Sequence, residues 1–350
     1  MPNRRQLARH IRTGTPAAVF DRLSDPAAQA LEALLDLASD RAQLTNAMPT
    51  ILDIAVANGC DAVAGLIDEA AQVHPELSMG YSRTIKGRSY KTLVRTGVPS
   101  VSFRNANEGT AATKGTYENR RVETFIMDPN WACDQAVADG HEDGAEAYIA
   151  IEGSGMVEGS MQTIASQLYY GSTNDAKGFP GLAEVYDSTN MAVDAGGTTA
   201  STQTSVWAVR FGPKDCGWVW GEDGRLDLSD VTLQRLTDAS SHPYWAYCQH
   251  LLAYPGFQVL STQSVGRVHS IHPSDSNASL TDDDLADLIS TFPTGRVPDA
   301  FFANRAAVAM LRKNRTATNA TGTPAPFPTE AFGIPLVQTD AITSTEEPPS

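Results

Sequence analysis

The alternation of apolar and polar residues predicts a long extended hairpin in the first third of the chain. Over residues 95–104 it places Val98 on one side of a strand and Val101 and Phe103 on the other. A polar turn with glycine follows, and a second polar extended run covers residues 113–124. Because neither face carries many large apolar side chains, such a hairpin buries little within its own subunit. We therefore expect it to pack on a neighbouring molecule, through these contact candidates: Val98, Val101, Phe103 and Arg104.

A different period predicts a long helix within residues 133–170, with Gly171 as its natural C-cap. Four apolar residues repeat at spacings of four, three and four, so they share one face of this helix: Val157, Met161, Ile164 and Leu168. Three glycines conflict with the helix, since each costs about 1 kcal/mol relative to alanine: Gly153, Gly155 and Gly159. Either the helix is interrupted there or another backbone packs closely against it.

Beyond residue 175 strand-like runs and helix starts follow one another, which favours an α+β fold. Residues 206–211 and 218–220 read as strands on either side of a Gly-Pro turn, and residues 257–271 alternate again. Residues 279–284 have the pattern of a capping box that starts a helix. A further helix is expected at 304–313, and a terminal strand at 333–337 before a frayed tail.

Residues 1–45 read as an appendage with one short amphipathic helix. Asp25-Pro26 is a natural helix start, and leucines line one face after it: Leu31, Leu34, Leu35 and Leu37. A helix this short is marginal in water by itself. We therefore expect it to dock on another surface, and Leu31, Leu34 and Leu35 are further inter-subunit contact candidates. Residues 48–73 read as a helical pair that is broken at Asn58-Gly59.

Composition and charge exclude several classes of protein. The chain of 350 residues has 41% hydrophobic and 19% charged residues, as in ordinary globular proteins. Its formal net charge of -15 argues against a sequence-reading nucleic-acid binder, which needs a basic face. No apolar run approaches the ~20 residues of a membrane span. The four cysteines are far apart without a CxxC pattern, which favours buried thiols in a reducing cytoplasm.

The motifs that mimic catalytic or metal sites all depart from their patterns. Gly153–Gly159 has GxGxxxG spacing outside a βαβ unit, so close helix packing is the favoured interpretation over a dinucleotide site. His141-Glu142 starts like a zinc-protease motif, but alanine stands at the second ligand position. His269 and His272 have no ligand-type neighbours at suitable spacing and are expected at a surface or interface. Asp275 opens a calcium-like loop that lacks its glycine and its final glutamate. We expect no enzyme activity, no cofactor and no metal.

Three stretches resemble the coat proteins of epsilon-fifteen-like short-tailed phages, a family of tailed-bacteriophage major capsid proteins. The resemblance covers roughly residues 50–345, and it rests on these motifs: Leu93-Val-Arg-Thr-Gly-Val-Pro-Ser-Val-Ser-Phe-Arg104 with Asn107-Glu-Gly109; Val157-Glu-Gly-Ser-Met-Gln-Thr-Ile-Ala-Ser-Gln-Leu-Tyr-Tyr-Gly171 with Phe179-Pro-Gly-Leu182; and Thr204-Ser-Val-Trp207 through Phe211-Gly-Pro213 to Cys216. These are packing motifs rather than catalytic ones.

The resemblance implies the HK-ninety-seven-type capsid fold, which is an α+β fold. Its parts would divide the chain as follows: a helical N-terminal arm at 1–75, an extended β-hairpin (E-loop) at 76–130, a peripheral domain with a long spine helix at 131–178, a mainly axial domain at 179–325, and at 326–350 a C-terminal strand that returns to the peripheral domain and a tail. Residues 1–45 exceed the family pattern, so an internal scaffold-like arm, a cleaved segment and an extra lattice contact all remain open.

The resemblance also implies a function, namely self-assembly into hexamers and pentamers of an icosahedral head around double-stranded DNA. Implied partners are other copies of the chain, a portal protein, scaffold and cement or decoration proteins, and DNA held without sequence preference. The implied location is the virion, and the host cytoplasm during assembly. Three alternatives remain open, namely an encapsulin-like compartment shell, another phage structural protein of the tail or decoration type, and a soluble enzyme.

Overall fold

The computed structural model describes residues 49–58, 66, 67, 70, 73–186, 191–318 and 323–349. The chain divides into two units, Met1–Met48 and Pro49–Ser350, and the described residues all belong to the second. The predicted helix that carries Leu31, Leu34 and Leu35 therefore lies outside them. Among the described residues, no helix has both the length and the apolar character needed to cross a bilayer.

A six-stranded mixed sheet organises much of the C-terminal half, in the order β14-β15-β13-β6-β12-β5. Its central strand β6 (Thr204–Val209) pairs antiparallel with both β12 and β13. The other strands are β5 (Ala192–Asp194), β12 (Val265–Ile271), β13 (Ala300–Ala303), β14 (Glu330–Ala331) and β15 (Ile334–Gln338). Every residue of β6, β12 and β13 is buried, because the sheet is covered on both faces. The predicted strands at 206–211 and 333–337 are confirmed within two residues. The run predicted at 257–271 is interrupted by a turn at residues 260–264, and its C-terminal part is β12.

Side chains along β6 alternate between two separate cores. Trp207 and Val209 belong to one apolar cluster, which includes residues of the long helix α8 (Ala145–Tyr170). Val206 and Ala208 belong to a second cluster, which includes residues of helices α10 (Asp282–Thr291) and α11 (Arg305–Ala317). Because successive side chains of a strand point to opposite faces, the single strand β6 contributes to both cores.

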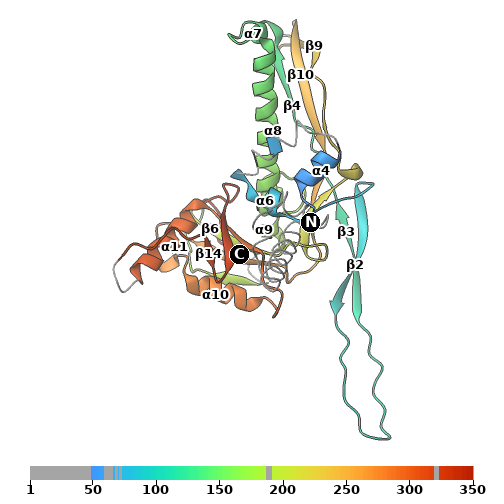
Figure 1. The fold of residues 1–350 in the computed structure, drawn as a ribbon, viewed down its shortest axis with the longest axis vertical. Helices are drawn as coiled ribbons and strands as arrows, with labels where there is room; N and C mark the ends of the chain where they lie inside the picture. The colour runs from blue at the N-terminus through green and yellow to red at the C-terminus, as the bar shows by residue number, and fades with distance from the viewer. Residues whose placement is uncertain are drawn as a thin grey trace, which may run out of the picture. The chain divides into compact units, whose positions relative to one another are not determined.

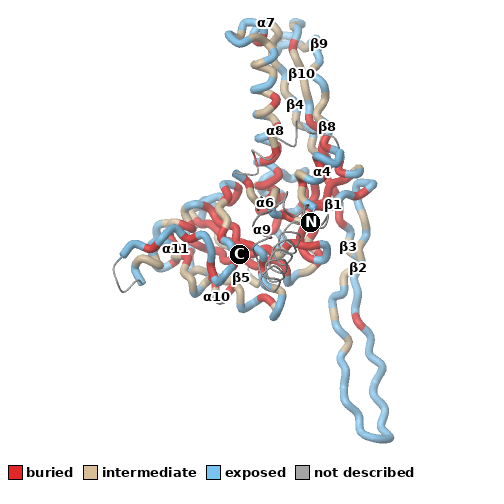
Figure 2. The backbone as a smooth tube through the Cα atoms, in the orientation of Figure 1, coloured by how far each residue is buried: buried red, intermediate tan, exposed pale blue. Residues whose placement is uncertain are grey.

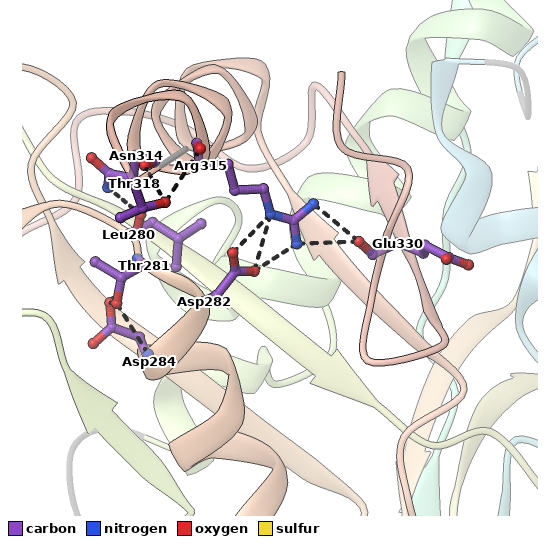
Figure 3. A network of polar contacts seen from close by, with 8 residues as sticks. All are labelled: Leu280, Thr281, Asp282, Asp284, Asn314, Arg315, Thr318 and Glu330. Carbon is purple, nitrogen blue, oxygen red and sulfur yellow. Dashed lines mark hydrogen bonds and ion pairs between the residues drawn. The ribbon is translucent and has the colours of Figure 1, made fainter. Parts of the chain in front are cut away.

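Two helices on one side of this sheet are joined by polar contacts. α10 (Asp282–Thr291) begins at Thr281, whose hydroxyl accepts from the Asp284 amide while the Asp284 carboxylate accepts from the Thr281 amide. The predicted capping box is therefore confirmed. At the far end of α11 (Arg305–Ala317), Arg315 donates to both carboxylate oxygens of Asp282 and to the Glu330 carbonyl of β14 (Figure 3). This helix continues four residues beyond the predicted end at Lys313.

The long helix α8 (Ala145–Tyr170) runs beside strands β4 and β10 (Figure 1). β10 (Pro243–Ala253) is antiparallel to β4 (Asn130–Asp134), β8 (Leu226–Leu228) and β9 (Thr232–Thr237). Short elements flank the helix, namely α7 (Gln135–Asp139), the 3-10 turn Gly171–Thr173 and α9 (Leu182–Val185). All four residues of the predicted apolar face are at most 2% exposed, so that face is confirmed.

A third sheet connects the start of the described chain to the C-terminal half. β7 (Cys216–Trp220) pairs with β1 (Ser82–Thr84) and β11 (Pro255–Val259). The helices α4 (Ile51–Ala57) and α6 (Pro75–Met79) precede it, and two further 3-10 turns cover Glu222–Gly224 and Ser276–Ala278. Asn58 is the C-cap of α4, as expected from the predicted break at Asn58-Gly59.

The glycines in α8 neither interrupt the helix nor meet another backbone. The helix is continuous through all three. A Cβ on Gly153 would approach only the Gln249 side-chain oxygen, at 3.1 Å, and a Cβ on Gly155 or Gly159 would meet nothing within 4 Å. The prediction of close backbone packing is therefore wrong within the described subunit. Burial of the apolar face of α8 compensates for the low helix propensity of glycine.

Three smaller predictions are corrected. The tail after β15 is anchored rather than frayed, because Glu346 is buried and bonded to residues far away in the chain. His269 is buried in β12 rather than exposed, with its Nδ1 2.8 Å from the Ser270 hydroxyl. Cys216 is buried as expected, but Cys133 on β4 and Cys248 on β10 are only half-buried, and Cys60 lies outside the described residues.

Candidate assembly surface

A two-stranded hairpin of β2 (Ser89–Gly97) and β3 (Thr116–Glu123) leads into a long loop (Figure 1). Register pairs Tyr90 with Val122 and Leu93 with Asn119, so alternate residues face opposite sides. One side packs on the body of the subunit, where Tyr90, Val94 and Val122 contact a small cluster. That cluster also contains Ile85, Val219 and Leu260. The base of the hairpin is therefore fixed.

Polar contacts reinforce this base. The Tyr90 hydroxyl donates to the Gln258 side-chain oxygen of β11, and Arg120 donates to the Val259 carbonyl at 3.2 Å. The guanidinium of Arg83 lies 4.5 Å from the centre of the Tyr90 ring. Burial raises the pKa of the Tyr90 hydroxyl, so this group stays a neutral donor at physiological pH.

Beyond Gly97 and Thr116 the chain leaves the ladder and becomes a loop of residues 98–115. The structure therefore corrects the predicted strand at 95–104, of which only residues 95–97 are paired. A register shift between Arg95 and Gly97 ends the ladder, and Pro99 has no amide hydrogen with which to continue it. A few local hydrogen bonds order the loop, among them Thr113 to the Ser100 carbonyl at 2.7 Å.

The loop brings together all four contact candidates predicted at 98–104. Val98, Val101 and Phe103 are 74%, 91% and 107% exposed, so the subunit itself buries almost none of their apolar surface. Arg104 donates to the Glu108 carbonyl at 2.8 Å, across the turn of the loop. Residues 100–114 are all exposed, and Figure 2 shows most of the extension as exposed. Exposed apolar side chains gathered in one segment are typical of protein contact sites.

Two further apolar residues on the outward side of the hairpin were missed by the sequence reasoning. Leu93 is 62% exposed and Tyr117 is 59% exposed. A signal existed, because Leu93 alternates with Lys91 and Arg95 on a strand that has no other large apolar residue on that side. The candidate assembly surface therefore comprises the loop tip and this outward face: Leu93, Val98, Val101, Phe103, Arg104 and Tyr117.

Charge is strongly segregated between the hairpin and the helix region that follows it. Residues 83–121 contain nine Lys or Arg and two acidic residues, whereas residues 122–176 contain ten Asp or Glu and neither Lys nor Arg. Several of these acidic side chains are exposed along α7 and α8: Asp139, Glu142, Asp143, Glu146 and Glu158. Two surfaces of opposite charge on one subunit favour contact between different copies.

No competing site emerges from the described residues. Gly153–Gly159 lies inside α8, so the Gly-rich turn of a dinucleotide site does not form there. Within the parts of the chain that the structure describes, no three His, Cys, Asp or Glu side chains are grouped to hold a metal ion. Burial raises the pKa of the Cys216 thiol well above its usual value, which disfavours a reactive thiolate at that position.

Comparisons with known proteins match the chain to phage capsid proteins. A family model described as major capsid protein GP7 matches residues 71–348. The structure of bacteriophage Epsilon15 is similar at 20% identity with a TM-score of 0.55, over 76% of this chain and 87% of that chain. The bacteriophage JBD30 capsid matches at 9% identity and a TM-score of 0.44, over 75% of this chain and 88% of that one. The holo-SrpI encapsulin complex from Synechococcus elongatus matches at 7% identity and a TM-score of 0.38, over 55% and 86%. A comparison with curated proteins found no match.

The likeness to Epsilon15 shows the fold, and the other two likenesses are too distant to support an argument. The mixed helix and sheet arrangement is thus the HK-ninety-seven-type fold that the resemblance implied. The matched family model covers most of the chain, including the hairpin, the long helix and the six-stranded sheet. The chain therefore belongs to the family of the major capsid protein GP7, and its role is that of a structural subunit of a phage capsid shell.

Proposed function

We propose that this subunit assembles into hexamers and pentamers of an icosahedral head, and that its hairpin supplies a principal contact between copies. The single observation that supports this most is the exposed loop of residues 98–115, with Phe103 fully exposed in the subunit. Leaving such apolar surface in water is unfavourable, at roughly 25 cal/mol per Å². Docking of the loop on a second copy removes that cost.

The acidic region of α7 and α8 is the proposed partner surface of the hairpin. Residues 83–121 carry nine Lys or Arg against two acidic residues and the acidic region has no Lys or Arg, so charge contacts between them are mostly between opposite charges. Exposed apolar residues also lie there, namely Val137 at 58% and Ile151 at 59% exposed. Opposite charge orients the two copies, and burial of apolar side chains on both sides stabilises the contact.

We propose the division of the chain into a helical arm at 1–75, an E-loop at 76–130, a peripheral domain from 131–178 with α8 as its spine helix, and a mainly axial domain at 179–325. We modify two of these assignments. β10 pairs with β4 beside α8, and β8 and β9 pair with β10, so we assign residues 226–253 to the peripheral domain as well. Residues 334–338 pair with β13, so we assign the C-terminal strand to the axial sheet.

The proposed partners follow from a head role. The main proposed partners are other copies of the same chain. A portal protein at one vertex and scaffold or cement proteins are further proposed partners. The net charge of -15 suits a shell that packages double-stranded DNA without gripping it. The arm with Leu31, Leu34 and Leu35 would add a contact on the inner surface, on a neighbour or on a scaffold. We propose no catalytic role. We propose that the protein assembles in the host cytoplasm and is then located in the virion.

Electron microscopy of the expressed full-length chain tests the proposal. Closed shells of uniform size with five-fold and six-fold capsomers are expected. Raising the salt concentration during assembly should lower the yield of shells, because charge pairing between copies is screened. A chain that stays monomeric, or that forms only tubes, contradicts the head assignment. Shells that form equally well at high salt contradict the charge-paired contact alone.

A further inference from the structure

Glu76 of α6 is a fully buried carboxyl at a junction of three parts of the fold. Its side chain is 0% exposed. Its oxygen Oε1 accepts from the Thr339 hydroxyl at 3.0 Å, and its backbone carbonyl accepts from the Trp218 indole at 3.1 Å. Tyr169, near the end of α8, is close enough for its buried hydroxyl to interact electrostatically with the carboxyl. Glu76 therefore connects α6 to β7 through its backbone and to the segment that follows β15 through its side chain, close to the end of α8.

The carboxyl lacks the partners that a buried charge requires. Among the described residues no group is within hydrogen-bonding distance of Glu76 Oε2 or of the Tyr169 hydroxyl. His74 Nδ1 lies 3.8 Å from Oε1, beyond a hydrogen bond, and burial lowers the pKa of this histidine. A buried carboxylate without a cation is strongly disfavoured, so the neutral acid fits this site better.

The titratable groups that face the junction either oppose a negative charge on Glu76 or supply no positive charge to balance it. Burial is the main cause that raises the pKa of Glu76 to about 7, and the charge of Asp340 adds to it. Hydrogen bonds from Thr339 and from the backbone of Glu76 itself act in the opposite direction. The charge of Glu158 of α8 acts to raise the pKa of His74, against the larger effect of burial. A cleft of about 300 Å³ beside it, lined by His74, Glu158 and Asp340 among others, gives water a path to this side.

The segment from Thr339 to Thr343, here called the return segment, reaches the Glu76 carboxyl through the Thr339 hydroxyl. It has no helix or strand of its own. Its hydrogen bonds include those from the Thr339 amide to the Ala303 carbonyl, from the Ala341 amide to the Thr339 hydroxyl and from the Thr343 amide to the Tyr170 hydroxyl. Ala341 and Ile342 are buried in the core that contains Trp207. Displacement of this segment would open the Glu76 carboxyl to water.

We propose that Glu76 is a proton-operated clasp, which holds the return segment against α6 and the end of α8 while the carboxyl carries its proton. Loss of the proton places an uncompensated charge in the junction. The displaced form, in which water reaches the carboxyl, is then favoured. The stability of the contact between the return segment and the rest of the subunit would thus depend on pH, which suits a subunit that must change its contacts during shell formation.

The expected pH dependence follows from the two forms of the carboxyl. In the displaced form the acid titrates near its usual value of 4.5, and in the closed form near 7. The equilibrium constant for displacement then rises about tenfold per pH unit between these values and levels off above 7. Between pH 5 and pH 7 the constant should rise roughly 40-fold, because the displaced form is already mostly ionised at pH 5 and the closed form is half ionised at pH 7.

Hydrogen exchange of peptides that span residues 339–343, measured on the full-length chain from pH 5 to pH 8, tests the clasp. Glu76→Gln keeps a neutral side chain at every pH, so the exchange rate of the unmodified protein relative to this variant should rise from pH 5 to 7 and then stay constant. Comparison at equal pH removes the intrinsic pH dependence of exchange. Glu347→Gln, which alters an exposed carboxylate four residues beyond the segment, is the matched control and should behave like the unmodified protein.

A ratio that does not change with pH overturns the proposal. If Glu76→Gln fails to fold, Thr339→Val provides the second comparison. This variant removes the hydroxyl that stabilises the charged form of Glu76. The pH at which the exchange rate of its return segment levels off should therefore be higher than in the unmodified protein. A return segment of the unmodified protein that shows the same protection at pH 5 and pH 7, after correction for intrinsic exchange, also overturns the clasp.

Discussion

Arg267 and Glu346 form a buried ion pair that ties the C-terminal tail to the six-stranded sheet. Their Nη2 and Oε2 atoms lie 3.0 Å apart, and the two side chains are only 6% and 5% exposed. The Ser205 and Tyr170 hydroxyls donate to the same carboxylate, and Arg267 lies over the Trp207 ring at 4.9 Å. A tail that looks polar and frayed in the sequence is thus held by the interior of the subunit.

Removal of the cation from this pair should destabilise the subunit strongly. Arg267→Met leaves Glu346 buried without its partner, which typically costs about 3–5 kcal/mol. Urea unfolding of the free subunit measures the loss. Arg305→Met is the matched control, because Arg305 and Asp340 form an exposed pair at the same 3.0 Å, and should cost less than ~1 kcal/mol. Equal losses in the two variants would show that burial of the pair adds nothing.

The two sides of α8 should respond in opposite ways to a charge. Leu168 is 2% exposed, so Leu168→Ala should cost about 2–5 kcal/mol and Leu168→Asp should abolish soluble expression. Ile151→Asp, on the same helix at a position 59% exposed, should leave stability within about 0.5 kcal/mol. Thermal unfolding monitored by circular dichroism separates these outcomes. A soluble, cooperatively folded Leu168→Asp protein contradicts the assigned helix face.

The hairpin loop should matter for assembly and not for folding. Phe103→Asp removes a fully exposed apolar contact, so unfolding should be unchanged while the yield of shells falls at least tenfold. Phe327→Asp, which alters another exposed phenylalanine at 49% exposure, is the matched control and should assemble normally. Sedimentation analysis measures the yield of shells.

The same loop should be cut by proteases only before assembly. Brief protease treatment should cleave the free subunit within residues 98–114 and spare finished particles, because the docked loop is no longer accessible. Cleavage at the same rate in both forms contradicts docking of the loop on a neighbour.

The buried Glu76 should make the stability of the whole subunit depend on pH. Burial raises its pKa to about 7 in the folded protein, from a usual 4.5. The folded state therefore binds the proton more tightly than the unfolded state, and the penalty for ionising it is absent below pH 4.5. It grows from pH 4.5 to 7 and then stays constant at on the order of 3 kcal/mol. Glu76→Gln should thus gain stability relative to the unmodified protein at pH 8 and little at pH 4.5, as measured by urea unfolding. The opposite order would show that this carboxyl is ionised in the fold.

Local periodicity predicted those elements that bury one well-defined face. The stripe of Val157 to Leu168 identified α8 despite its glycines, because apolar burial outweighs a small loss of helix propensity. The capping box at Thr281 and Asp284 gave the start of α10, because its chemistry lies within four residues. The exposed contact candidates at 98–104 were found for a similar reason, since an apolar residue amid polar ones is visible in the sequence.

What the sequence reasoning missed depends on partners that are distant along the chain. The strand predicted at 95–104 fails beyond Gly97 because β3 offers no pairing partner there. β10 was not recognised as a strand, since its aromatic and polar residues alternate without a clear apolar side, and it becomes a strand by pairing with β4, β8 and β9. The burial of Glu346 follows from Arg267, which is 79 residues away and leaves no local signal.

The position of β15 in the sheet has a consequence for how the protein is made. This strand lies beside β13 but is synthesised after it. Until residues 334–338 have left the ribosome, β13 has an open edge with which other strands can pair incorrectly. A chain must therefore be translated through β15 before this part of the sheet is protected, so synthesis that stops earlier leaves a subunit with an unpaired strand edge.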